Sequence, residues 1–268
     1  MFFYSFLIII TTLIAYIIRN LIYSMLYNTK FLKKNYKGQY IPLGMGMFFP
    51  IALISSLTVL YLFFPLDNIS FVFILGVTLM SFLGIIDDLL GNRDTTGLKG
   101  HISKLFQLQL TTGGLKALMG GIVSLLVSIP FNSNILLLIF NALIIASFTN
   151  LINLLDLRPG RAIKFYLLYT IILFGFYNQQ YIYLLLVVTI IALVYFPMDI
   201  KAIAMMGDAG SNSLGFVLGF FTTIYFTNPF KVLILILLIF IHIYAERSSI
   251  TKLIENNRIL SFIDKLGR

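Results

Sequence analysis

Four aspartates occur at points where long apolar segments give way to polar sequence. Asp87 and Asp88 are adjacent, Asp156 ends one apolar segment, and Asp208 precedes another. Carboxylate oxygens are the ligands that Mg²⁺ prefers, and this ion usually keeps further positions for water and substrate phosphate. Two neighbouring carboxylates also repel each other unless a cation lies between them. We therefore expect a divalent-cation site for phosphate chemistry, although each aspartate taken alone would also suit the end of a helix.

Small and polar residues accompany these aspartates. Asp208 lies in Met-Gly-Asp-Ala-Gly-Ser-Asn-Ser (206–213), where exposed backbone N–H groups at the start of a helix would favour a phosphate. Asn150, Asn153 and Asp156 recur at three-residue spacing, so a helix would place them on one slowly rotating face. A polar stripe at the end of an apolar helix lines either a cavity or a contact between helices. Both interpretations stay open for this stripe.

The composition identifies the elements that must position these residues. The chain has 268 residues, of which 59% are hydrophobic and 11% charged, and its mean hydropathy is +0.98. Soluble domains carry about 25% charged residues, so a single soluble globule and a disordered chain are both excluded. We expect an all-α, polytopic transmembrane helical bundle of about nine spans. The predicted spans are residues 2–18, 48–64, 70–86, 105–129, 135–155, 163–176, 181–196, 213–226 and 232–244.

The basic residues predict the orientation of this bundle. Of the 19 Lys and Arg residues, 17 fall in one set of alternate loops. The positive-inside rule then places the N-terminus outside and the C-terminus in the cytoplasm, and it explains the net charge of +9 without a nucleic-acid partner. The four aspartates lie at the predicted cytoplasmic face. Lys116, inside the fourth predicted span, either faces them or extends to the membrane surface.

Residues 246–268 differ from the rest of the chain. Apolar residues recur there at helical spacing among Lys252, Arg258 and Lys265, which is typical of a cationic amphipathic helix on the inner leaflet. We therefore expect a transmembrane catalytic domain over residues 1–245 and a cytoplasmic amphipathic tail over residues 246–268. The chain has no cysteine, which excludes disulfides and thiolate metal sites.

Five short motifs follow one another along most of the chain, each at a predicted cytoplasmic end of a span. They are Pro42-Leu-Gly44-Met-Gly46 with Lys37 before it, Gly84-Ile-Ile-Asp87-Asp88, Gly97-Leu98 with Lys104 and Gln107, Asn150-x-x-Asn153-x-x-Asp156, and Met206-Gly207-Asp208-x-Gly210-Ser211. In this combination and order the chain resembles the polyprenyl-phosphate N-acetylhexosamine-1-phosphate transferase superfamily.

The resemblance implies an enzyme of the bacterial plasma membrane whose active site faces the cytoplasm. Such an enzyme transfers a sugar-1-phosphate from a UDP-sugar to undecaprenyl phosphate and releases UMP, with Mg²⁺, or alternatively Mn²⁺, bridging the diphosphate. It further implies catalytic roles for Asp87, Asp88 and Asp156, and metal ligation by Asp208 and Asp88. The substrate-binding residues that it implies are Lys37, Gly44, Gly46, Lys104, Asn150 and Asn153.

The chain also departs from the family's pattern after the second and fourth of these motifs. A second acid is expected after Asp156, but the sequence continues Leu-Arg158-Pro-Gly-Arg161, and the lysine expected after Asp87-Asp88 is Gly91. We expect Arg158 and Arg161 to bind substrate phosphate, because guanidinium groups contact phosphate in a bidentate manner. The alternative is that both arginines are cytoplasmic anchors of the positive-inside kind.

Two other functions and one assembly question stay open at this stage. A family member without activity would act as an assembly partner, and an ion-coupled transporter or flippase would use the acids to bind its coupling ion. A transporter favours acids in mid-membrane and two related halves, whereas nine of the ten acids here lie on the predicted cytoplasmic side. A homodimer is also compatible with the sequence.

Overall fold

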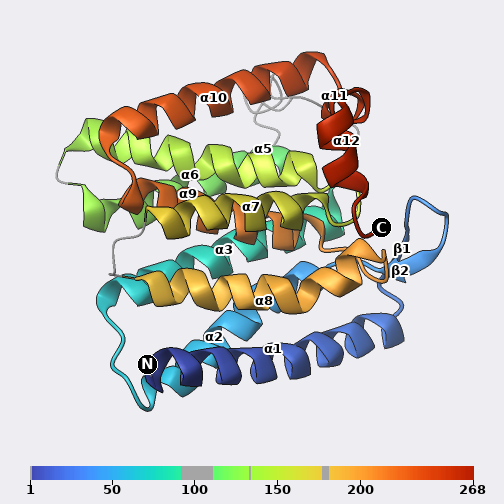
Figure 1. Cartoon of the computed structure of the whole chain (residues 1–268), viewed down its shortest axis with the longest axis horizontal. Helices are drawn as coiled ribbons and strands as arrows, with labels where there is room; N and C mark the ends of the chain where they lie inside the picture. The colour runs from blue at the N-terminus through green and yellow to red at the C-terminus, as the bar shows by residue number, and fades with distance from the viewer. Residues whose placement is uncertain (1, 92–110, 133, 177–180) are drawn as a thin grey trace.

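The computed structural model describes residues 2–91, 111–132, 134–176 and 181–268, and it is a bundle of long helices (Figure 1). Within that part of the chain the long helices are α1 (Phe2–Asn28), α2 (Phe48–Tyr61), α3 (Asn68–Leu90), α5 (Thr112–Ser128), α6 (Ile135–Leu155), α7 (Arg161–Gly175), α8 (Ile182–Ile200), α9 (Gly207–Tyr225) and α10 (Asn228–Arg247). Short 3-10 helices precede α2 (η1, Met45–Met47) and follow α5 (η2, Ile129–Phe131).

Each predicted span overlaps one of these helices, and the range predicted for α6 is the observed one. Residues 105–110 of the fourth predicted span lie outside the described residues. Six of the helices, α1, α3, α5 with η2, α6, α8 and α10, are long and apolar enough to cross a membrane. The chain is therefore a multi-pass membrane protein with an all-α fold. Helices α2 and α7 have 14 and 15 residues, which is about 22 Å of rise against a hydrocarbon core of about 30 Å. The total of nine spans consequently stays a prediction.

Helix α9 forms the centre of the bundle, where it packs against α3, α6 and α7. Every residue from Ala209 to Thr223 is buried. Gly215 and Gly219, which lie one helical turn apart, let its backbone approach α6 closely, since a Cβ on Gly219 would lie 2.6 Å from the Ile145 Cα. A helix buried on all sides holds its two ends in fixed positions. The N-terminal end of α9 carries Asp208.

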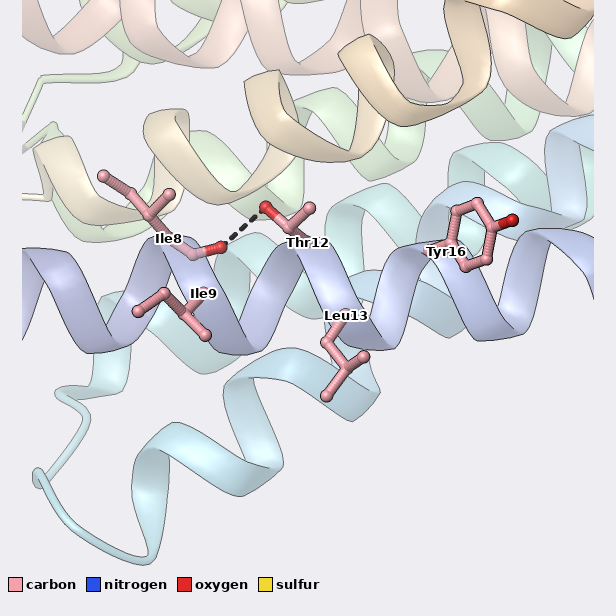
Figure 2. A pocket seen from close by; sticks show the side chains of 5 residues that line it. All are labelled: Ile8, Ile9, Thr12, Leu13 and Tyr16. Atoms are coloured by element: carbon pink, nitrogen blue, oxygen red, sulfur yellow. Dashed lines mark hydrogen bonds between the residues drawn. The ribbon is translucent and has the colours of Figure 1, made fainter.

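The outer helices present apolar side chains that other parts of the chain do not cover. Figure 2 shows a hollow on the outer face of α1 that is lined by Ile8, Ile9, Thr12, Leu13 and Tyr16. The Thr12 hydroxyl donates to the Ile8 carbonyl of its own helix (2.7 Å), so this polar group needs no further partner. Ile9 and Leu13 are more than half exposed. An apolar surface of this kind suits contact with lipid.

Two local features differ from the sequence prediction. Strands β1 (Leu32–Lys34) and β2 (Tyr40–Pro42) form an antiparallel hairpin after α1, with Leu32 opposite Pro42. The tail is not one helix but two, α11 (Ile250–Asn256) and α12 (Arg258–Lys265), because Asn257 ends the first and caps the second. Figure 1 shows the hairpin, the tail helices and the C-terminus together at one end of the bundle.

Candidate active site

Lys116 connects two of the predicted acidic residues. Its ammonium nitrogen lies 3.8 Å from Asp87 Oδ2 at the end of α3, and it donates a hydrogen bond to Asp208 Oδ2 at the start of α9. Helix α5 begins at Thr112, with the Thr111 hydroxyl accepting from the Gly114 N–H (3.0 Å), so Lys116 lies in its second turn. Of the two positions that the sequence left open for Lys116, the structure shows the one facing the acids.

Asp88 binds the start of α9 rather than facing Lys116. Its Oδ1 accepts from the backbone N–H of Asp208 (3.1 Å), and its Oδ2 accepts from that of Ala209 (3.3 Å). A carboxylate is favourable there because the N-terminal end of a helix carries partial positive charge. From the sequence, these N–H groups are expected to be exposed and to favour a phosphate. In the structure, two of them already have an acceptor from the protein.

The three carboxylates come together because α3 and α9 approach closely. A Cβ on Gly84, one turn before Asp88, would overlap the backbone of Asp208. The carboxylates of Asp87 and Asp208 both contact the Lys116 ammonium, which places them near each other. The two helices therefore hold these acids against each other, with the ammonium of Lys116 beside them.

Asn153, at the end of α6, completes this cluster. In the amide orientation that satisfies both of its polar atoms, its nitrogen donates to Asp208 Oδ1 (2.9 Å) and Ser211 Oγ (3.2 Å). Its oxygen then accepts from the Lys116 ammonium (2.7 Å). The amide orientation is assigned from this hydrogen-bond network. We name Asp87, Lys116, Asn153 and Asp208 the Lys116 cluster.

The other two residues of the α6 stripe differ in their surroundings. Asp156 follows the last residue of α6 and is half-buried, whereas Asn150 is exposed one turn before Asn153. Burial, followed by the negative charge of Asp199, raises the pKa of Asp156 well above its usual range. The stripe thus contributes Asn153 to the Lys116 cluster, while the catalytic role of Asp156 and substrate binding by Asn150 stay predictions.

Gly44 and Gly46 hold the segment after β2 against the start of α9. Gly44 has a φ of +82°, which favours glycine, and it begins η1. The Gly46 N–H donates to the Met206 carbonyl (2.8 Å), and a Cβ on Gly46 would overlap the backbone of Gly210. Backbone conformation at Gly44 and close packing at Gly46 therefore explain why glycine occupies these positions. Substrate binding by the two residues stays a prediction.

The two arginines of the α6–α7 connection contact the tail. The buried Arg161 donates from Nε to Asp264 Oδ1 (2.8 Å) and from Nη2 to Asp264 Oδ2 (3.0 Å). Arg158 lies 3.7 Å from Glu255 at a more exposed position. In the structure the Arg161 guanidinium therefore has a carboxylate partner within the chain, and phosphate binding by the two arginines stays a prediction.

Two lysines were predicted to bind substrate, Lys37 and Lys104, and a third lysine near the site was not predicted. Lys37 lies in the exposed turn of the hairpin, with its ammonium 5.4 Å from the centre of the Tyr36 ring. Lys104 lies outside the residues that the structure describes. Lys33 in β1 is close enough to act electrostatically on Asp208. No sequence pattern indicates that Lys33 lies near Asp208, because this position depends on a hairpin that the apolar pattern does not predict.

A family model of glycosyl transferase family 4 matches residues 70–226, which is more than half of the chain. The chain belongs to glycosyl transferase family 4. This family consists of polyprenyl-phosphate sugar-1-phosphate transferases, so membership confirms the resemblance found in the sequence. It implies polyprenyl phosphate and a sugar nucleotide as the substrate classes. A comparison with curated proteins gave no match. The matched range contains every member of the Lys116 cluster, together with Asp88 and Asp156.

The oxygen donors of this family 4 transferase suit a hard divalent cation. Among the described residues, no group of three or more His, Cys, Asp or Glu side chains is arranged to hold a metal ion by itself. Mg²⁺, however, is usually bound by one or two carboxylates, with water and substrate phosphate at its other positions. Asp87 and Asp208 provide such a pair, and an ammonium group already lies beside both. The residues present therefore fit Mg²⁺ bound together with substrate.

Proposed function

We propose that this protein transfers a sugar-1-phosphate from a UDP-sugar to undecaprenyl phosphate in a bacterial plasma membrane and releases UMP. The observation that carries the proposal is the Lys116 cluster, which brings carboxylates from α3 and α9 together at one end of the bundle. Family membership supports the general reaction class, and the donor, the lipid and the ion are parts of the proposal.

The contacts of Asp87, Asp88 and Asp208 suggest a role for each of them in the proposed reaction. Asp208 and Asp87 would hold Mg²⁺ because both carboxylates already contact one cationic group, the Lys116 ammonium. Asp88 would position the start of α9 and could supply a third carboxylate ligand, since each of its oxygens keeps a lone pair after accepting one N–H. When bound, the ion would neutralise charge on the diphosphate as UMP leaves. Asn153 would orient Asp208 through its amide nitrogen.

The proposed orientation places the site at the cytoplasmic face. The described basic segments include the hairpin and the tail, and both lie at one end of the bundle (Figure 1). Lys33 of this hairpin acts electrostatically on Asp208, which links the same end to the site. A site at a bilayer surface also suits the reaction, because one substrate is a lipid phosphate and the other is a water-soluble nucleotide. The product would feed cell-wall polymer or glycan assembly.

An exchange assay tests the proposal. Purified protein in detergent would receive undecaprenyl phosphate, Mg²⁺ or Mn²⁺, and a panel of UDP-sugars, with UMP release as the readout. We expect metal-dependent UMP release from one donor, and loss of at least about 100-fold in Asp87→Asn and Asp208→Asn, since removal of one electrostatic contact to developing charge costs about that much.

Asp67→Asn is the matched control for these variants. Asp67 caps the other end of α3, where its Oδ1 accepts from the Ser70 N–H (2.9 Å), and asparagine caps helices equally well. The control should retain full activity. Folded protein that releases no UMP from any donor would contradict the proposal and favour a family member without activity.

A further inference from the structure

Lys116 occupies the place between the carboxylates where a divalent cation would bind. Its ammonium contacts Asp87 Oδ2 and Asp208 Oδ2, which are the two groups that we assign to the metal. The lysine side chain is largely buried, with 17% exposure, so water screens these charges little. An ammonium and a divalent cation cannot share the same carboxylate oxygens without repelling each other.

We propose that Lys116 is an internal counter-ion that competes with the divalent cation for Asp87 and Asp208. This inference rests on the proposed function for the presence of the cation. The lysine neutralises one of the negative charges that α3 and α9 bring together, and the empty site is thereby kept stable. Binding of the cation displaces the ammonium from the carboxylates.

Asn153 provides the place to which the displaced ammonium moves. Its side-chain oxygen lies 2.7 Å from the Lys116 nitrogen and carries no formal charge. Four methylene groups allow the ammonium to turn away from the carboxylates while it keeps this hydrogen bond. Lys116 thus sets the concentration of cation at which the site fills, and it acts through the carboxylates.

The test measures cation binding without substrates. Purified full-length protein would be unfolded by heat over a range of Mg²⁺ and Mn²⁺ concentrations, and binding of Mn²⁺ would be measured directly by electron paramagnetic resonance. We expect Lys116→Met to respond at about tenfold lower cation concentration than the unaltered protein, because removal of a nearby positive charge strengthens cation binding. Lys116→Gln, which keeps a hydrogen-bond donor, serves the same purpose if the methionine variant does not fold.

Lys231→Met is the matched control, because Lys231 is a buried lysine of α10 in the first turn of that helix. It should bind the cation like the unaltered protein. Equal or weaker cation binding in both Lys116 variants would overturn this inference alone, provided that Asp208→Asn abolishes the response of the unaltered protein. A complete lack of cation binding in all proteins would overturn both this inference and the metal part of the proposed function.

Discussion

Gly84 shows how strongly one residue constrains this site. The backbone of Asp208 lies where a side chain on Gly84 would be, so a methyl group there must separate α3 from α9. We expect Gly84→Ala to lower the free energy of unfolding by about 1–3 kcal/mol, which is typical of overpacking. It should also reduce UMP release, because Asp87 and Asp208 would move apart. Thermal unfolding and the exchange assay measure the two effects.

Gly121→Ala is the control for Gly84→Ala, because it makes the same chemical change at a glycine with open space around it. Gly121 lies in α5, and apart from its chain neighbours and the backbone of its own helix, no atom of the described residues lies within 4 Å of the position of an added Cβ. Alanine is favoured over glycine in a helix by about 1 kcal/mol, so this variant should be slightly more stable and equally active. If Gly84→Ala behaved like Gly121→Ala, the close approach of α3 and α9 would not be needed for activity.

The sequence predicted that the acidic residues of the site lie together, but it did not determine the position of Lys116 beside them. Asp87 and Asp208 were predicted to meet because each lies at an end of an apolar segment on the same predicted face. The position of Lys116 could not be decided, because the span predicted from residue 105 places it eleven residues deep. The helix described from Thr112 places it in the second turn instead. Hydropathy alone does not locate a helix end when apolar residues continue beyond it.

At the scale of elements, the sequence did not predict that the tail docks on the bundle, because this docking depends on contacts between residues distant in sequence. The apolar periodicity predicted the long helices because burial in lipid and in the bundle determines each of them locally. The docking of the tail depends on Arg161 and Asp264, which are 103 residues apart. No local pattern indicates such a pair. The tail was therefore predicted as a separate amphipathic helix, whereas α12 is joined to the start of α7.

Asp264 is one of the tail residues that contact the bundle, and its carboxylate is buried. Arg161 binds both of its carboxylate oxygens, and Arg268 donates to Oδ1 (2.8 Å). Removal of one member of a buried ion pair costs about 3–5 kcal/mol, because the other charge stays buried. We expect Asp264→Asn to release α12, and limited proteolysis should then cut the tail faster. Glu255→Gln, which alters the more exposed pair with Arg158, should change this rate little.

The same ion pair predicts how tail docking depends on pH. Burial alone would raise the pKa of Asp264, but the Arg161 guanidinium and the charge of Arg268 outweigh burial and hold this pKa below its usual value. A carboxyl group with a lowered folded pKa stabilises docking fully above its unfolded pKa of about 4, and this contribution is lost as the pH falls through the folded value. We expect α12 to stay docked down to about pH 4 and to detach below it.

Hydrogen exchange of residues 258–265 at several pH values measures this detachment. Asp264→Asn serves as the control, since its protection, taken as the exchange rate relative to the intrinsic rate at each pH, should no longer change through the same pH range. Detachment of the tail between about pH 5 and pH 7 would show that a group other than Asp264 controls docking, because that range lies above the pKa of a carboxyl group stabilised by arginine.

At the scale of the whole molecule, the predicted cytoplasmic side and the fold indicate the same end of the bundle for the candidate active site. The tail and the two aspartates of the Lys116 cluster lie on the predicted cytoplasmic side, and α9 passes from this end through the centre of the bundle. The exposed apolar side chains of α1 and α10 surround that centre. Under the proposed function, a lipid phosphate would approach the site along the bundle surface and the nucleotide would come from water.

The orientation of the bundle can be tested on α10 alone. Thr227 and Ser248 flank this helix at its two ends, and both are exposed. Because the natural chain has no cysteine, Thr227→Cys and Ser248→Cys each introduce a single thiol. With the C-terminus in the cytoplasm, we expect a membrane-impermeant maleimide to label the Thr227 variant on intact cells and the Ser248 variant only after permeabilisation. The reverse pattern would place the Lys116 cluster outside the cell, where UDP-sugars are not supplied, and would contradict the proposed reaction.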